Sequence, residues 1–344
     1  MLKWYEQKAP DGDVVISSRV RLARNLTNYP FSLKISNDQA KKMVEEVKEI
    51  TEDLSHGTGK KHYSCNLSTL ANIDKRAMVE RHIISPHLVE KQQVTGLILS
   101  EDETISIMIN EEDHLRIQSI VGGMNLEAAY EVASRVDDIA SEKLDIAFDK
   151  KYGYLASCPT NVGTGLRASC MVFLPALSSA GIINRMFEEL SKYGVTIRGI
   201  YGEGSKSLGS LYQISNQKTL GNTEQEIIYS LNNVVNQIVR QERLKRQEIK
   251  DNNYDKMEDQ VYRAYGVLKY ARQLTSSEAI SLLAQIKLAI DCGLIKFDKD
   301  VNIHKLMMGV QPGSLQWTIG KDVDDSQEKH SRAEYLRKKI PKVI

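Results

Sequence analysis

The densest group of reactive side chains in the sequence is the run NEEDHLR at residues 110–116. It follows residues 104–109, where isoleucine alternates with other residues and so predicts a strand. Three successive carboxylates, a histidine and an arginine at a strand end suit the binding of a cationic group. The alternative is a solvated acidic turn that opens a helix, with Glu112 and Arg116 as an i,i+4 pair.

Two arginines stand two residues apart in VVISSRVRLAR, residues 14–24. If this segment is extended, Arg19 and Arg21 share one face while Val20 and Leu22 occupy the other. Neighbouring guanidinium groups repel each other unless they share an anion, and phosphate matches their geometry best. An edge strand with a solvated basic face is the alternative.

A third cluster, SCPTNVGTGLRASCM at residues 157–171, contains the turn-forming residues of a shaped loop that ends in an apolar run at 171–177. Arg167 follows Gly165 by two residues, and backbone amides beside an arginine can hold phosphate oxygens. Cys158 adjoins this loop, where nearby arginines would favour its thiolate. A buried, inert thiol is the commoner role for a free cysteine.

A fourth cluster begins with a predicted strand at residues 195–200, which carries Arg198, and continues into YGEGSKSLG at 201–209. Glu203 is a lone acid between two glycines on a loop otherwise suited to anions. This loop and HGTGKK at residues 56–61 both lack the GxxxxGK[ST] spacing. We therefore exclude a P-loop nucleoside triphosphatase and interpret 56–61 as a surface loop.

The elements that must position these clusters are readable from periodicity. Apolar residues at helical spacing predict amphipathic helices at 37–54, 126–144 and 182–193. Residues 94–99 and 104–109 predict an antiparallel hairpin, and residues 211–214 a further short strand.

A long helix begins at Thr223, which with Glu226 forms a capping box. Its end, residues 240–255, is highly charged, and we predict a domain boundary there. Helices are expected at 262–274, from Thr275 to Cys292, and near 304–310, before a charged tail that we expect to be loosely held. The predicted divisions are a lead-in at 1–13, a catalytic domain at 14–244 and a helical domain at 245–344.

Bulk composition excludes several classes of protein. The 344 residues are 41% hydrophobic and 26% charged, with a net charge of +1, so nothing suggests nucleic-acid binding by bulk charge. No apolar run approaches membrane-spanning length, and the N-terminus has no signal-peptide pattern. Four widely spaced cysteines predict free thiols in a reducing cytoplasm.

Together, the five arginines suit a polyphosphate such as ATP, with Mg²⁺ supplying further positive charge. The isolated acids Glu112 and Glu203 suit a cationic acceptor. This division of charge predicts phosphoryl transfer to a guanidinium or an amine.

Four segments, SSRVRLAR, NEEDHLR, CPTNVGTGLR and RGIYGEG, resemble in order the signatures of the phosphagen (guanidino) kinases and span residues 17–209. The resemblance implies an α+β fold, an antiparallel sheet flanked by helices as in glutamine synthetase, followed here by a small all-helical domain. It implies that Glu112 and Glu203 hold and activate the guanidinium, that Cys158 is the reactive cysteine, and that Mg²⁺ is held mainly through the nucleotide rather than by a protein metal site. The ATP-binding positions it implies are Ser17, Ser18, Arg19, Val20, Arg21, His82, Arg116, Arg167, Ala168, Ser169, Cys170, Met171, Arg198, Gly199, Ile200, Tyr201, Gly202 and Glu203.

The chain departs from the metabolite kinases of this family. It begins almost at the catalytic domain, so the guanidinium pocket is expected to be open on that side, and Tyr201 and Gly204 replace a basic residue and a histidine. The added helical domain makes the chain similar to the bacterial protein-arginine kinases. That similarity implies a cytoplasmic, homodimeric stress-response enzyme that phosphorylates exposed arginines, including those of a heat-shock repressor, and marks proteins for a Clp protease. It also implies a zinc-finger activator and a Clp unfoldase as partners.

Those kinases carry an RDxxRA motif that binds phosphoarginine allosterically. The matching segment, residues 328–333, keeps only Arg332 and Ala333, and this departure argues against phosphoarginine sensing there. Two other functions remain open: a kinase of free arginine or another small guanidine, and a catalytically silent adaptor.

Overall fold

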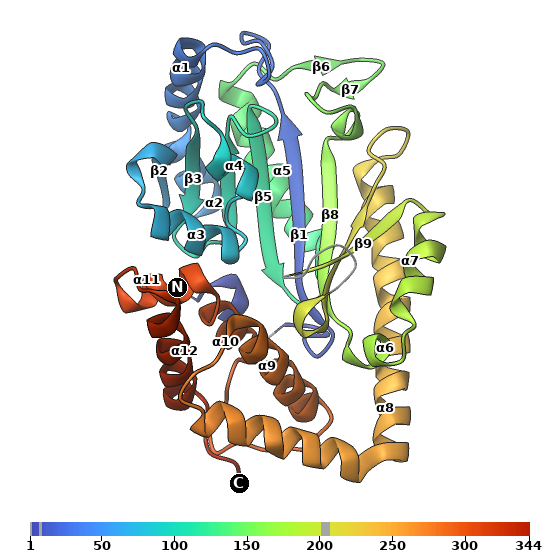
Figure 1. Ribbon diagram of the computed structural model, residues 1–344. Coiled ribbons are helices and arrows are strands. Elements are labelled where there is room, and N and C mark those ends of the chain that lie inside the picture. The colour runs from blue at the N-terminus through green and yellow to red at the C-terminus, as the bar shows by residue number, and fades with distance from the viewer. Residues whose placement is uncertain (1, 7–8, 201–206) are drawn as a thin grey trace.

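The computed structural model describes residues 2–6, 9–200 and 207–344. Its centre is an antiparallel sheet with strand order β2-β3-β4-β5-β1-β8-β10-β9, beside a separate β6-β7 hairpin (Figure 1). The strands are β1 (Val15–Arg24), β2 (His62–Asn66), β3 (Gly96–Ser100), β4 (Ile105–Ile109), β5 (Leu115–Gly122), β6 (Phe148–Asp149), β7 (Gly153–Tyr154), β8 (Leu166–Phe173), β9 (Val195–Gly199) and β10 (Leu211–Asn216). The expected antiparallel α+β fold is confirmed.

The first arginine pair lies in the middle of this sheet. β1 pairs with β5 on one side and with β8 on the other, so the edge-strand interpretation is wrong. Val20 and Leu22 are buried in the main apolar core, while Arg19 and Arg21 project from the opposite face. The period-2 pattern therefore gave the correct faces for this strand.

Helices cover the apolar face of the sheet. They include α1 (Asn37–Lys48), α2 (Thr51–Thr58), α5 (Leu126–Lys143) and the first half of α8 (Glu224–Tyr270), whose buried residues join the core of the strands. The predicted 37–54 helix is divided near Ile50, and residues 56–58 belong to α2 rather than to a loop. The other helices are α3 (Asn72–Glu80), α4 (Pro86–Glu90), α6 (Pro175–Ser179), α7 (Ile183–Ser191), α9 (Ser276–Asp291), α10 (Ile303–Gly309), α11 (Pro312–Ile319) and α12 (Asp325–Lys339).

The acidic run at 110–116 does not open a helix. It forms a tight turn between β4 and β5, closed by a hydrogen bond from Asn110 N to His114 O. Because Arg116 lies on the strand β5, it pairs with Glu111 rather than with Glu112. The i,i+4 interpretation of Glu112 and Arg116 is therefore wrong.

The helical region lies below the sheet in Figure 1 and is entered through α8. This helix crosses the predicted boundary at 244 without a break and is interrupted only at Asn253, so residues 262–270 continue it rather than forming a separate helix. The expectation of a loosely held tail is wrong, since α12 buries Arg332, Ala333 and Leu336. No helix in the described ranges is both long and apolar enough to cross a membrane.

Candidate active site

Five arginines lie on one face of five adjacent strands. In the strand registers Arg21 stands opposite Arg167, Arg116 follows diagonally on β5, and Arg198 is reached across Gln213 of β10. Neighbouring strands are about 4.8 Å apart, and residues i and i+2 of one strand are about 6.6 Å apart. These guanidinium groups therefore share a single surface. The sequence predicted each of these residues, and the sheet brings all five together.

Polar side chains of the same face hold two of the guanidinium groups. Arg19 Nη2 donates to Gln213 Oε1 at 2.8 Å, and its Nε lies 3.4 Å from Ser169 Oγ. Arg167 Nη2 donates to Ser215 Oγ at 3.1 Å. Gln213 and Ser215 were missed from sequence, although their alternation along β10 with Tyr212 and Ile214 was a usable signal.

The electrostatics of this surface favour a bound anion. Burial and the charges of Arg116 and Arg167 lower the pKa of Arg19 to about 9, and the pKa of Arg21 is also lowered by burial and by its arginine neighbours. Arg19 therefore remains charged at neutral pH. The Nε atoms of Arg21 and Arg167 are buried and make no hydrogen bond to any described residue. A polyanion would supply both the missing acceptors and the missing negative charge.

The 110–114 turn lies at one end of the arginine surface, and its acidic residues have different environments. Glu111 is buried; its Oε1 accepts bonds from Arg116 Nη1 and Ser85 Oγ, and its Oε2 accepts the backbone N–H of Glu112 at 2.7 Å. Burial raises the pKa of Glu111. Arg116 and these hydrogen bonds together lower it by more than burial raises it, so the pKa of Glu111 lies below its usual range. The Glu112 carboxylate, in contrast, is exposed to solvent.

Asp113 and His114 fasten this turn to the rest of the molecule. Asp113 Oδ1 accepts from Asn25 Nδ2 at 2.7 Å and from Ser157 N at 2.6 Å. His114 Nδ1 accepts from the backbone N–H of Leu26 at 3.0 Å, so the ring is neutral and its Nε2 donates to a carbonyl. Burial also lowers the pKa of His114. Both residues are structural, which leaves Glu112 as the available acid of the motif.

The loop before β8 lies against this acid. Asn161 Nδ2 is 3.4 Å from Glu112 Oε2 and 3.2 Å from Asp113 Oδ2. Cys158, three residues earlier, is half-buried with its Sγ 3.0 Å from Thr160 Oγ1. The structure therefore places the predicted cysteine on the loop that contacts Glu112, and Asn161 is a contact that sequence reasoning missed.

His82 lies in a turn after α3, with a positive φ of 61°. Its carbonyl accepts from Gln118 Nε2 at 2.8 Å, and Gln118 belongs to the arginine face of β5. Burial and the nearby Arg19 and His304 lower the pKa of His82 to about 3, so its ring is neutral at pH 7. A neutral imidazole beside the arginines is compatible with the predicted nucleotide contact.

The residues predicted to bind ATP form contiguous ranges along strands, so their side chains alternate between the two faces of the sheet. Ser17, Arg19 and Arg21 alternate along β1 with Ser18 and Val20, whose side chains lie on the opposite, helix-covered face. The same parity separates two further groups. Arg167, Ser169 and Met171 share the arginine face, whereas Ala168, Cys170 and Gly199 are on the other, and Ile200 packs against the helical region. The side chains of Ser18, Val20, Ala168 and Cys170 therefore face away from the arginine surface, and ATP binding at these positions stays a prediction. Tyr201, Gly202 and Glu203 lie outside the described residues.

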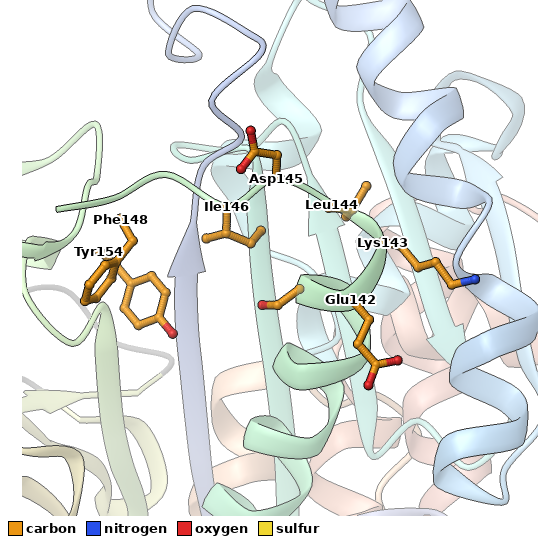
Figure 2. Close-up of a pocket in the computed structure, with 8 residues that line it drawn as sticks. Glu142, Lys143, Leu144, Asp145, Ile146, Phe148 and Tyr154 are labelled. Carbon is orange, nitrogen blue, oxygen red and sulfur yellow. The ribbon is translucent and has the colours of Figure 1, made fainter. Parts of the chain in front are cut away.

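The structure also contains a recess of about 610 Å³. Figure 2 shows the side chains that line it. It is formed at the C-terminal end of α5 by Glu142, Asp145, Phe148 and Tyr154, among others. Because α5 covers the apolar face, this recess does not belong to the arginine site.

A magnesium ion is compatible with the groups around the turn. The described residues contain no cluster of three or more His, Cys, Asp or Glu side chains placed to hold a metal. Mg²⁺ needs only one or two carboxylates when nucleotide phosphates supply the other oxygens. An ion held mainly by the nucleotide phosphates would leave Glu112 available for the acceptor, while Glu111 is already occupied by Arg116.

Two family models match the chain. Residues 42–245 match the ATP:guanido phosphotransferase C-terminal catalytic domain, and residues 254–343 match the protein-arginine kinase McsB C-terminal domain. Curated relatives match over nearly the full length. The protein-arginine kinase of Halalkalibacterium halodurans is 45% identical over 337 residues, covering 98% of this chain and 94% of the relative. That of Halothermothrix orenii is 44% identical over 338 residues, covering 98% and 96%.

Solved structures share this fold over 71% to 73% of the chain. A substrate-free duplicated taurocyamine kinase from Schistosoma mansoni is 26% identical with a TM-score of 0.60, covering 71% of this chain and 36% of that one. The crystal structure of a lombricine kinase has a TM-score of 0.61 and 24% identity, covering 73% of this chain and 71% of that one.

Proposed function

Because this chain belongs to the ATP:guanido phosphotransferase family, and within it to the protein-arginine kinases, we propose that it transfers the γ-phosphoryl group of ATP to arginine side chains of proteins. The observation that carries the proposal is the surface of five arginines ending at the exposed acid Glu112. An anionic donor and a cationic acceptor would meet there.

The arginine face binds the triphosphate. Arg19, Arg21 and Arg167 neutralise its oxygens and hold them in place, and Arg116, fixed by Glu111, completes the surface beside the turn. Such fixed positive groups stabilise charge as the phosphoryl group is transferred. Mg²⁺ bound through the nucleotide phosphates would supply further neutralisation.

The acids prepare the acceptor. A free guanidinium has a pKa above about 12 and is a poor nucleophile. Glu112 binds its N–H groups, orients its plane and accepts the proton that is released when the nitrogen attacks the γ-phosphorus. The bond to the β-phosphate oxygen breaks and ADP leaves. We assign the second acid to Glu203, which lies outside the described residues, and the neighbouring reactive thiol to Cys158.

The remaining assignments rest on the family resemblance. We propose a cytoplasmic, homodimeric enzyme whose phosphoarginine products are marked for a Clp protease and include a heat-shock repressor, with a zinc-finger activator and a Clp unfoldase as partners. We retain the domain division after residue 244. Because Arg332 is buried and its guanidinium bonds two carbonyls and Glu328, we propose a structural role for it instead of phosphoarginine binding.

The test is incubation with Mg-ATP and casein, with free arginine as a competing acceptor, followed by mass spectrometry at neutral pH to preserve the P–N bond. Phosphate on protein arginines is expected, with most activity lost in Glu112→Gln while ATP binding persists. The charge-matched control is Glu142→Gln, an exposed acid on α5. Phosphate on free arginine alone would indicate a metabolite kinase, and transfer to neither acceptor would indicate an adaptor.

A further inference from the structure

The segment Glu80-Arg81-His82 connects the sheet region with the helical region. Glu80 ends α3, and its two carboxylate oxygens accept the backbone N–H groups of Gly313 at 2.8 Å and Ser314 at 2.6 Å. Both amides belong to the first turn of α11, whose own N-cap residue, Gln311, makes no side-chain cap. Glu80 therefore caps a helix whose bonded amides lie 233 and 234 residues away in the chain, and it adds a favourable charge at the positive end of that helix.

The next two residues extend this contact. The Arg81 guanidinium lies over the Trp317 ring of α11, 4.9 Å from its centroid. The His82 ring lies 6.5 Å from the Trp4 ring of the N-terminal lead-in, and Trp4 in turn lies 5.8 Å from His304 of α10. Three consecutive residues thus contact two segments outside the sheet, α11 and the lead-in, and Trp4 of the lead-in continues the contact to α10.

The same contacts reach the arginine surface. Arg19 stands directly opposite Ile120 in the register of β1 and β5. Ile120 forms a small buried cluster with Trp4 and Met308, the latter from α10. The helical region is therefore packed against the strand position next to a predicted phosphate-binding arginine, on the side away from Glu112.

The fit between α3 and α11 is close enough to be sensitive to one carbon atom. A Cβ on Gly313 would lie 2.7 Å from Arg76 Cβ and 2.9 Å from the Arg76 carbonyl carbon. The His82 turn also has a left-handed backbone, which a non-glycine residue keeps only where its surroundings determine it. A displacement of α11 would release the Glu80 anchor two residues before that turn.

We propose that Glu80 and α11 form a latch that positions the His82 turn, so that the helical region sets the enzyme's affinity for nucleotide. The inference rests on the proposed function through the nucleotide roles of His82 and Arg19. Glu80, Gly313 and Trp317 act as positioning residues, since they touch neither donor nor acceptor. When the latch is intact, His82 and Arg19 are already in the positions that bind nucleotide. When it is broken, part of the binding free energy is used to order the His82 turn, so the affinity falls.

The test measures the affinity for Mg-ADP by calorimetry on the full-length protein, together with kcat and the KM for ATP and for casein. Glu80→Gln and Trp317→Ala are each expected to weaken nucleotide affinity about five-fold. They should raise the KM for ATP while leaving kcat at saturating ATP and the KM for casein near wild type. Trp317→Phe, which keeps an aromatic ring under Arg81, should restore affinity.

Glu90→Gln is the matched control, because it removes the same charge from an exposed residue of nearby α4. Gly313→Ala should reproduce the effect by steric displacement. Unchanged nucleotide affinity in both Glu80→Gln and Trp317→Ala would overturn the latch, as would an equal loss of kcat and of affinity for both substrates. A wild-type protein that binds no nucleotide would instead overturn the proposed function.

Discussion

Glu111 offers a sharp test of the idea that the arginine surface is incomplete without an anion. Its carboxylate is the negative group bonded to Arg116, and it also accepts the hydroxyl of Ser85 and the backbone N–H of Glu112. Glu111→Gln keeps the shape of the side chain and removes its charge. Stability and anion affinity should then change in opposite directions.

The stability loss follows from burial. Breaking a buried ion pair costs about 3–5 kcal/mol. The Glu111 side chain is 3% exposed but that of Arg116 is 23% exposed, so water compensates part of the loss. We expect the free energy of unfolding to fall by about 2 kcal/mol.

The affinity for anions should rise. One unit charge about 10 Å from a phosphate, at an effective dielectric constant of about 20, contributes about 1.7 kcal/mol, and salt reduces this to about 1 kcal/mol. Removing the negative charge should therefore lower the Kd for Mg-ATP about five-fold. Urea unfolding and calorimetry measure the two quantities, with Glu142→Gln as the control that changes neither. A variant that is destabilised and also binds ATP more weakly would refute this reasoning.

Three further predictions concern stability and binding elsewhere. Burial raises the pKa of Asp102, but bonds from Lys60 and neighbouring groups lower it to about 2, below the ordinary 3.8. The ionised Asp102 contributes up to about 2 kcal/mol to the free energy of unfolding; this contribution is complete above about pH 4 and is lost as the pH falls toward 2. Asp102→Asn should therefore be less stable than wild type in urea unfolding at pH 7 and equally stable in acid. Gly165→Ala should lower the Tm and weaken ATP binding, because φ is +63° and a Cβ would lie 2.6 Å from Ala23 O; unchanged values for both would contradict the need for glycine beside the arginine surface. Arg332→Gln should lower the free energy of unfolding by about 3 kcal/mol, since the side chain is 1% exposed and bonds two backbone carbonyls and a carboxylate, whereas a folded variant of wild-type stability would revive a ligand-binding role.

Local patterns in the sequence were sufficient for most elements and for the chemical type of the site. Period-2 alternation placed Arg19 and Arg21 on one face because side chains of any strand alternate. The capping box of Thr223 and Glu226 is present at the start of α8, because its groups lie within one helical turn. Local patterns were misleading where a residue distant in the sequence determines whether a segment is packed. The sequence of α12 is polar, but Arg332 packs this helix against segments near residues 274 and 310.

The sequence by itself determined that arginines, glycine-rich loops and isolated acids of a phosphotransferase are present. Only the tertiary structure decided how these groups divide their tasks. Glu111, Glu112 and Asp113 are chemically alike in the sequence, but Arg116 on β5 engages the first and Asn25 engages the third. Glu112 contacts Asn161 of the loop before β8 but stays exposed, because the fold brings charged or buried partners to its two neighbours. The physical reason is that periodicity and capping act over a few residues, whereas charge pairing and burial depend on which strands and helices the fold places together.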